Sequence, residues 1–189
     1  MGIGFEKPGR LKSDDTVLVV VDFQERMVPA MREGASAVAE GVKLIKGFEA
    51  LGCPILITQQ YTKGLGESVP EIREAFTSFS HIEKSTFSVM GDQGFVEALK
   101  DIGRKTVVLC GVEAHVCILQ SALDLLEAGY GVFLATDAIS SRKARDEEPA
   151  VKRMIQAGVV PTTAESVLFE LLDNDSKSET FKAISRLVK

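Results

Sequence analysis

Short runs of β-branched residues alternate along this chain with segments of helical periodicity. The first run, Thr16–Val21, reads TVLVVV, which is typical of a strand buried on both faces. Apolar residues then recur at spacings of three and four over Ala35–Leu51, and Gly52 ends this helical pattern before Pro54 opens the next strand. Such βαβ repetition predicts an α/β fold with a mostly parallel, open, doubly wound sheet.

The same alternation continues to the end of the chain. It predicts further strands at Ile55–Thr58, His81–Lys84, Thr106–Cys110, Val132–Thr136 and Val159–Thr163. It predicts helices near Pro70–Phe76, Phe95–Ile102, Ala114–Glu127, Glu147–Ala157, Glu165–Leu172 and Glu179–Leu187. Gln59–Val69 is expected to be a loop, and Gly111 is expected to break the fourth strand. No linker or internal repeat is visible, so residues 1–189 are expected to form one domain.

The composition argues against several functional classes. The net charge of −5 predicts no basic face of the kind that binds nucleic acid. The longest apolar run is far too short to cross a bilayer, and the first ten residues lack the apolar core of a secretory signal. Three cysteines do not make a disulfide framework. We therefore expect a cytoplasmic protein with no nucleic-acid or membrane partner.

Several cofactor and catalytic motifs are absent from the sequence. Neither GxGxxG nor GxxxxGK[ST] occurs, so a dinucleotide or P-loop nucleotide would lack its phosphate-binding loop. The GxSxG nucleophile elbow is also missing. The two histidines, His81 and His115, belong to no HExxH pattern, so a catalytic zinc is not indicated. We expect neither a cofactor nor a metal.

Cys117 is the most informative candidate residue. It lies six residues beyond Gly111, near the start of the helix predicted to leave the fourth strand. Free amides and the positive end of the helix dipole would lower the pKa of its thiol and make it a nucleophile, and the same amides could hold an oxyanion. The alternative is a small buried hydrophobic residue, as most free cysteines are. Cys53 and Cys110 are better explained as core residues.

Asp22 and Lys84 follow two other predicted strands. Asp22 ends the run VLVVVD, where a buried carboxylate needs a partner or a pocket. It either accepts the thiol proton as a general base or caps the following segment. Lys84 by itself is most simply a solvated surface residue, but beside a carboxylate and a thiol its charge would hold the first and lower the pKa of the second. Spacing alone does not establish that proximity.

Neighbouring residues complete the candidate site. Glu113 and His115 either touch substrate or face solvent or a neighbouring subunit. The charged run Arg142–Glu148 is explained by a solvated loop and a helix start. The aromatic residues near the strand ends either line a pocket or belong to the core. We expect the substrate pocket to include Phe23, Gln24, Gln60, Tyr61, Phe87 and Val112.

Three stretches together resemble one known family. VVVDFQ contains Asp22, HIEKSTFS contains Lys84, and GVEAHVCILQSALDLLEAGY contains Cys117. The sequence resembles the isochorismatase-like cysteine hydrolases, a superfamily that includes nicotinamidases and related amidases. The likeness runs from about Thr16 to the terminal helix. LITQQYTKGLG and ATDAISSR are especially similar to the branch of isochorismatase domain-containing proteins.

The resemblance implies a three-layer fold and a catalytic triad. The fold would be a six-stranded parallel sheet with helices on both faces, and the triad would be Asp22, Lys84 and Cys117. Asp22 would take the proton from Cys117, Lys84 would orient Asp22, and the sulfur would attack a carbonyl to give a thioester that water hydrolyses. The family also has a non-proline cis peptide, here expected between Val112 and Glu113. Its role would be to turn the amide of Glu113, with that of Cys117, towards one oxyanion.

Two departures from the family narrow the expected activity. Metal-binding nicotinamidases carry an Asp-x-His pattern and a second His after the second strand, whereas this chain has Gln59, Gln60 and Tyr61 there. Isochorismatases that cleave a vinyl ether typically lack the cysteine, so Cys117 favours acyl chemistry. The family's members commonly form homo-oligomers, and we expect the same here.

Two functions of different classes remain after this argument. The first is a metal-independent cysteine hydrolase that acts on a small amide or related acyl compound. The second is a non-catalytic scaffold or interaction protein that has kept the hydrolase fold. A receiver-type signalling domain is set aside, because it needs an aspartate after the third strand, where this chain has Lys84.

Overall fold

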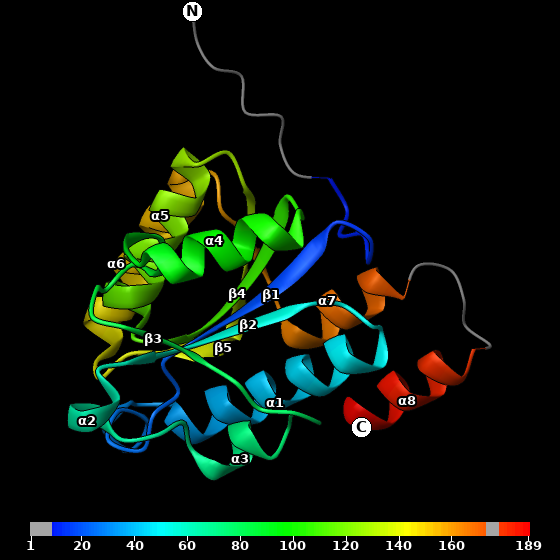
Figure 1. Cartoon of the computed structure of the whole chain (residues 1–189), viewed down its shortest axis with the longest axis horizontal. Coiled ribbons are helices and arrows are strands. Elements are labelled where there is room, and N and C mark those ends of the chain that lie inside the picture. Colours follow the sequence, from blue (N-terminus) through cyan, green and yellow to red (C-terminus); the bar gives the residue numbers. More distant parts are fainter. Residues whose placement is uncertain (1–8, 173–177) are drawn as a thin grey trace, which may run out of the picture.

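A six-stranded parallel sheet forms the centre of the computed structural model, which describes residues 9–172 and 178–189 (Figure 1). The strand order is β3-β2-β1-β4-β5-β6, and every neighbouring pair is parallel. The strands are β1 (Thr16–Val21), β2 (Ile55–Gln60), β3 (Ile82–Lys84), β4 (Thr106–Val112), β5 (Gly131–Ser140) and β6 (Val160–Thr162). The order reverses between β1 and β4, and ligands of such sheets bind outside the carboxyl ends of the strands at this switch point.

Helices cover both faces of the sheet, which confirms the predicted three-layer doubly wound fold (Figure 1). One layer contains α1 (Gly34–Ala50), α3 (Pro70–Arg73), α7 (Ala164–Leu171) and α8 (Glu179–Leu187). The other contains α4 (Gln93–Ile102), α5 (Leu119–Glu127) and α6 (Ala144–Ala157). Shorter turns are α2 (Thr62–Leu65), the 3-10 turns η1 (Val28–Ala30) and η2 (Val89–Gly91), and the π-helical turn η3 (Ala114–Ile118).

The core has two halves because β1 is buried on both faces. Leu18 and Val20 pack towards the α1 layer, whereas Val17, Val19 and Val21 pack towards the α4 to α6 layer. All five side chains are fully buried. Burying an aliphatic side chain of this size contributes about 1.5–3 kcal/mol, so β1 anchors both layers and holds its carboxyl end in a fixed place.

Gly111 does not end the fourth strand, which corrects one expectation. Strand β4 continues to Val112, and the ladder to β5 shifts register between Leu109 and Gly111. Gly111 has a φ of 127°, and a Cβ there would lie 2.0 Å from the carbonyl oxygen of Val21. Glycine is therefore needed because the backbones of β1 and β4 approach closely at the switch point.

The segment after β4 begins as a π-helical turn, not as the uniform α-helix predicted over Ala114–Glu127. Ile118 donates its amide hydrogen to the carbonyl of Glu113 at 3.2 Å, a five-residue spacing, and α5 starts only at Leu119. Such wide turns occur frequently at functional sites. The turn shifts the side chains of η3 relative to α5, and Cys117 lies in it.

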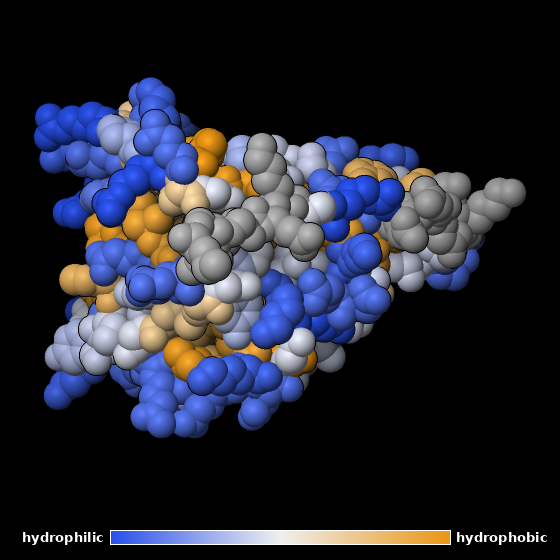
Figure 2. All heavy atoms as spheres, turned by 90° about the horizontal axis from the view of Figure 1, so that it is seen from above, coloured by the Kyte–Doolittle hydropathy of each residue, from blue (hydrophilic) through white to orange (hydrophobic). Residues whose placement is uncertain are grey.

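Hydrophilic side chains are prominent on the face shown in Figure 2, with apolar residues visible between them. No helix within residues 9–172 and 178–189 combines the length and apolarity that a bilayer-spanning segment needs.

Candidate active site

Asp22 leaves the carboxyl end of β1 in a left-handed backbone conformation, with a φ of 54°. Aspartate is one of the few residues that tolerates this region, which turns the chain sharply after the strand. The carboxylate is fully buried and accepts hydrogen bonds from Thr58 Oγ1 at 2.8 Å and from Lys84 Nζ at 2.6 Å. Because these partners come from β2 and β3, the carboxylate does not cap the next segment, which was one of its two expected roles.

Lys84 is buried at the end of β3 and not solvated. Its ammonium forms an ion pair with Asp22, 62 residues earlier in the chain, and neither side chain is exposed. Three further oxygens lie within hydrogen-bond distance of Nζ: Gln60 Oε1 at 2.6 Å, the Thr86 carbonyl at 3.0 Å and the Phe87 carbonyl at 3.2 Å. A buried ammonium requires such acceptors, since an uncompensated charge in the core is costly.

Cys117 meets the same carboxylate from the other side of the switch point. Its side chain lies in η3 and is 4% exposed. The Asp22 carboxylate and the Glu113 amide both lie close enough to the sulfur to influence the pKa of the thiol. The structure therefore brings Asp22, Lys84 and Cys117 together from β1, β3 and the turn after β4.

The pKa of the Cys117 thiol is raised and not lowered, which differs from the expectation for a cysteine near a helix start. Burial raises the pKa of the Cys117 thiol to about 12, and the negative charge of Asp22 adds to this rise, although Lys84 and the Glu113 amide oppose it. Burial also raises the pKa of the Asp22 carboxyl, against the opposing influence of Lys84, Thr58 and Cys117. The resting cysteine is thus a neutral thiol beside a carboxylate that is more basic than an ordinary aspartate.

The turn that carries Glu113 is tied to the loop after β5. The Val112–Glu113 peptide bond is cis. The Glu113 carboxylate is largely buried and accepts a hydrogen bond from Arg142 Nε at 2.9 Å. Nδ1 of His115 lies 4.0 Å from the same carboxylate and 2.9 Å from Ser141 Oγ. The charged run after β5 is therefore not merely a solvated loop, since Arg142 contacts the turn that precedes Cys117.

The expected pocket residues separate into buried and exposed groups. Phe23 is fully buried in the α1 half of the core, where its ring lies against Gly41, so it packs in the core and does not line a pocket on the Cys117 side. Val112 is also buried in the α1 half. The side chain of Gln24 bridges the backbones of Gln60 and Gly66, which gives it a structural role in the loop after β2.

Tyr61 and Phe87 are the exposed members of the expected pocket set, and Gln60 is half-buried. They are 56% and 55% exposed, respectively. Their backbones flank Lys84, because the Tyr61 amide donates to the Lys84 carbonyl and the Phe87 carbonyl accepts from Lys84 Nζ. Tyr61 has a φ of 41°, which is rare for a bulky residue and is found most often at functional sites. Their role as substrate contacts remains a prediction.

Thr58 is a site residue that the sequence argument missed. It pairs with Val21 in the ladder between β1 and β2, and this register places its hydroxyl beside the next residue, Asp22. A polar residue at the end of the predicted strand Ile55–Thr58 was the available signal. The second missed feature is the use of Gln60, whose amide oxygen contacts Lys84 and whose nitrogen donates to the Ser85 carbonyl at 3.1 Å.

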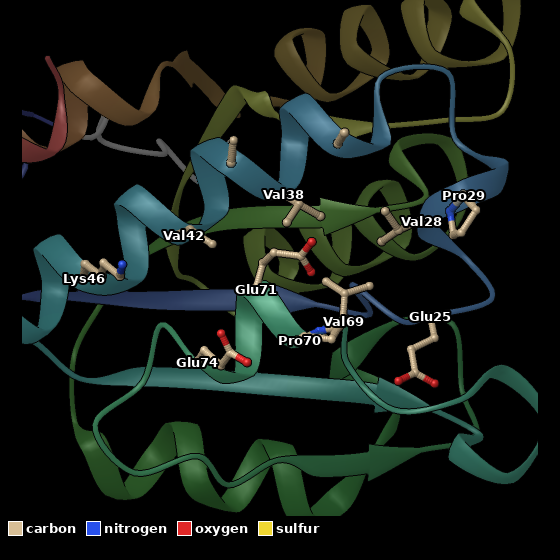
Figure 3. A pocket seen from close by; sticks show the side chains of 12 residues that line it. Glu25, Val28, Pro29, Val38, Val42, Lys46, Val69, Pro70, Glu71 and Glu74 are labelled. Atoms are coloured by element: carbon tan, nitrogen blue, oxygen red, sulfur yellow. The ribbon is translucent and has the colours of Figure 1, made fainter.

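A groove of about 810 Å³ lies apart from these residues, between α1 and the segment that leads into α3 (Figure 3). Apolar side chains from α1 form one wall, and carboxylates lie along the opposite side and at one end (Figure 3). It is lined by Glu25, Val28, Pro29, Ala35, Val38, Ala39, Val42, Lys46, Val69, Pro70, Glu71 and Glu74. None of the three converging residues contributes to it.

The donor set of the site suits acid–base and thiol chemistry. Among residues 9–172 and 178–189, no three His, Cys, Asp or Glu side chains are arranged to hold a metal ion. The cysteines at positions 53, 110 and 117 are free and buried. Burial raises the pKa of both Cys53 and Cys110, and neither has an aspartate and a lysine arranged around it as Cys117 has.

Comparison with known proteins identifies a matching family. The isochorismatase domain matches residues 16–166. Isochorismatase domain-containing protein 2 from Danio rerio is 37% identical over 181 residues, which cover 95% of this chain and 90% of that protein. Isochorismatase domain-containing protein 1 from Salmo salar is 36% identical over 96% of this chain, but the match spans only 63% of that longer protein.

Solved structures have the same fold. The MAR1 ribonuclease of Caenorhabditis elegans has a TM-score of 0.88 and 35% identity, covering 95% of this chain and 92% of that one. YcaC of Escherichia coli, described as an octameric hydrolase of unknown specificity, has a TM-score of 0.87 and 26% identity over 94% and 88%. YcaC of Pseudomonas aeruginosa, solved with hexane-2,5-diol and covalent acrylamide, has a TM-score of 0.86 and 26% identity over 97% and 92%.

Proposed function

Because the chain belongs to the isochorismatase family and has its hydrolase fold, we propose that it is a cysteine hydrolase of a small amide or related acyl compound. One observation carries this proposal. A single carboxylate, that of Asp22, lies between a buried ammonium and a thiol at the topological switch point. A base beside a thiol, oriented by a third group, is the arrangement that nucleophilic catalysis requires.

Acylation begins with proton transfer from the Cys117 thiol to Asp22. The sulfur attacks the carbonyl carbon of the substrate, and the carbonyl oxygen becomes an oxyanion that the amides of Glu113 and Cys117 stabilise. The protonated Asp22 then gives its proton to the leaving nitrogen, the C–N bond breaks, and ammonia or an amine leaves. The acyl group remains on the sulfur as a thioester.

Deacylation repeats these roles with water. Asp22 takes a proton from a water molecule, whose oxygen attacks the thioester carbon, and the same amides hold the second oxyanion. The C–S bond breaks, the sulfur recovers the proton from Asp22, and a carboxylic acid is released. Lys84 stays charged throughout and stabilises the carboxylate form of Asp22, which must be regenerated after each half-reaction.

The proposed reaction needs no metal, because the chain itself supplies the nucleophile, the base and the oxyanion donors. The raised pKa of Asp22 also fits this role, since a more basic carboxylate removes a thiol proton more readily. The covalent acrylamide on the Pseudomonas aeruginosa relative supports a reactive group in this fold. The octameric relative from Escherichia coli supports assembly of this chain into a homo-oligomer.

The ribonuclease description of the Caenorhabditis elegans relative suggests a different substrate. We do not extend it to this chain, because a net charge of −5 opposes the binding of a polyanion and a buried thiol is suited to attack on carbonyl carbon. The same preparation can be tested on both substrates, with release of acid-soluble nucleotides from RNA as the second assay.

The test uses p-nitrophenyl acetate, a small activated acyl donor that does not depend on knowing the natural substrate. We expect a burst of p-nitrophenolate that approaches one equivalent of enzyme, together with an acetyl group located on Cys117 by mass spectrometry. The Cys117→Ala variant should lose the burst. Cys53→Ala is the matched control, because it removes another buried free thiol and should keep the burst.

A screen of small primary amides for ammonia release then identifies the substrate class. Hydroxylamine in the assay should divert the thioester to a hydroxamate. Absence of the burst in the wild-type protein, or an equal burst in Cys117→Ala, would overturn the proposal and favour the non-catalytic alternative.

A further inference from the structure

The ammonium of Lys84 has more acceptors around it than protons to donate. Asp22 Oδ2 and Gln60 Oε1 are both 2.6 Å from Nζ, whereas the carbonyls of Thr86 and Phe87 are 3.0 and 3.2 Å away. An ammonium has three protons, so it cannot donate to all four oxygens at once. The two shortest contacts, to Asp22 and Gln60, determine the orientation of its N–H bonds. One of these two comes from a neutral amide that the proposed reaction does not use.

The orientation of the Gln60 amide is determined by its partners. Its nitrogen donates to the carbonyl of Ser85, which can only accept, and its oxygen accepts from Lys84, which can only donate. The reverse orientation would place an NH₂ group against an ammonium. The Gln60 amide is thus fixed at both ends by protein partners.

The backbone of Gln60 is also fixed by hydrogen bonds. Gln24 Oε1 accepts from the Gln60 amide at 2.7 Å, and Gln24 Nε2 donates to the Gln60 carbonyl at 3.0 Å and to the Gly66 carbonyl at 2.7 Å. Gln24 is fully buried and follows Asp22 by two residues. A continuous chain of hydrogen bonds therefore connects the turn after β1, through Gln24 and Gln60, to the Lys84 ammonium on β3.

We propose that Gln60 is a positioning residue whose neutral amide oxygen holds the Lys84 ammonium against the Asp22 carboxylate. This inference rests on the proposed function. The amide accepts a hydrogen bond from Lys84 and adds no charge, so it holds the ammonium in place without competing electrostatically with Asp22. A carboxylate at position 60 would share the ammonium and repel Asp22, and an apolar side chain would release one side of it.

The groups that face Asp22 all belong to this arrangement. Lys84 approaches from β3, the hydroxyl of Thr58 from β2 and the thiol of Cys117 from η3. The ammonium is the cation among them, and it opposes the rise in the pKa of Asp22 that burial causes. Any change that moves or shares the ammonium should therefore make Asp22 take up its proton at a higher pH.

The experiment compares Gln60→Met and Gln60→Glu with Gln59→Met. The first variant keeps the length of the side chain without an acceptor, and the second keeps the acceptor but adds a charge. Gln59 is the matched control, because it is the buried neighbour on β2 and bonds to Glu67, Ser68 and Thr62 in place of Lys84. It reports what loss of a buried glutamine does by itself.

The primary readout is the titration of the Asp22 carboxyl carbon by 13C NMR, with the resonance assigned from Asp22→Asn. We expect the midpoint to rise by about one pH unit or more in both Gln60 variants and to stay within about 0.3 unit of wild type in Gln59→Met. The acid limb of the p-nitrophenyl acetate burst rate should move with it. Above that limb Gln60→Met should still lose more than tenfold in rate.

An unchanged Asp22 midpoint in the Gln60 variants would overturn the inference, as would an equal shift in Gln59→Met. If Gln60→Met fails to fold, Gln60→Leu takes its place, because it also removes the acceptor without adding a charge. The NMR titration requires no turnover. A wild-type protein without an acylation burst would therefore refute the proposed function, while the titration would still decide whether Gln60 positions Lys84.

Discussion

Replacing Lys84 by methionine should show how much the buried ion pair between Lys84 and Asp22 contributes to the free energy of unfolding. Nζ of Lys84 lies 2.6 Å from Asp22 Oδ2, and neither side chain is exposed. Methionine keeps most of the apolar length of lysine but removes the charge. It leaves a buried carboxylate that accepts a hydrogen bond from Thr58 and lies near the Cys117 thiol. An uncompensated charge of this kind is among the most destabilising changes a core can undergo.

The expected cost is about 3–5 kcal/mol at neutral pH, the usual range when one partner of a buried pair is removed. With a urea dependence of about 2 kcal/mol per molar, the unfolding midpoint would fall by roughly 2 M. Circular dichroism during urea unfolding at pH 7.5 measures this directly. A loss below about 1 kcal/mol would mean that the pair behaves like an exposed one.

The cost should depend on pH with a definite sign. Burial already raises the folded-state pKa of Asp22, and loss of Lys84 removes an influence that lowers it, so the pKa rises further in the variant. In the unfolded chain the same carboxyl titrates near about 3.9. Between these two values the folded variant binds more protons than the unfolded chain, so the variant gains stability as the pH falls. The deficit of Lys84→Met relative to wild type should therefore shrink from pH 7.5 to pH 5.

The double variant Asp22→Asn/Lys84→Met separates charge from packing. Asn has no charge to leave uncompensated, so the double variant should be more stable than Lys84→Met alone at pH 7.5. The reasoning is refuted if the deficit of Lys84→Met is the same at both pH values. It is also refuted if the double variant loses the sum of the two single losses.

Three further changes have expected outcomes. Gly111→Ala should lose about 3 kcal/mol or more in urea unfolding, because its Cβ would lie 2.0 Å from the Val21 carbonyl oxygen at a φ of 127°; a stability close to wild type would contradict this. Arg142→Met should lose at most about 1 kcal/mol, because Arg142 is 59% exposed although it contacts Glu113, and a larger loss in the same assay would show a deeper structural role. Alkylation of Cys117 by iodoacetamide, measured by mass spectrometry, should accelerate with each pH unit from 7 to 10, because burial raises the pKa of this thiol to about 12. A rate that reaches a plateau near pH 7 would contradict that value.

Local pattern was sufficient for most of the fold. The valine-rich run Thr16–Val21 predicted a strand buried on both faces, and the structure confirms it. The ends of strands and helices were less accurate, because they depend on contacts with neighbouring elements. Gly111, for example, is a standard helix or strand breaker in a sequence, but it lies inside β4 where two backbones nearly touch. Its φ follows from a contact with a strand some 90 residues earlier.

For the candidate site too, some features follow from the sequence and others only from the structure. The positions of Asp22, Lys84 and Cys117 at strand ends follow from the sequence, because the carboxyl ends of parallel strands meet at one edge. Their contacts and protonation do not. The helix-start argument for Cys117 predicted a lowered thiol pKa, but desolvation and the charge of Asp22 outweigh the local amides.

The sequence by itself thus determined the layer architecture, the order of the strands and helices along the chain, and the residue types near the strand ends. These features rest on periodicities and breakers that act over a few residues. The tertiary structure alone decided that Lys84 is buried, that Phe23 packs in the core and that Gln60 contacts an ammonium. Those outcomes depend on contacts between side chains that lie far apart in the sequence and bury one another. Such contacts leave no pattern among neighbouring residues of the chain.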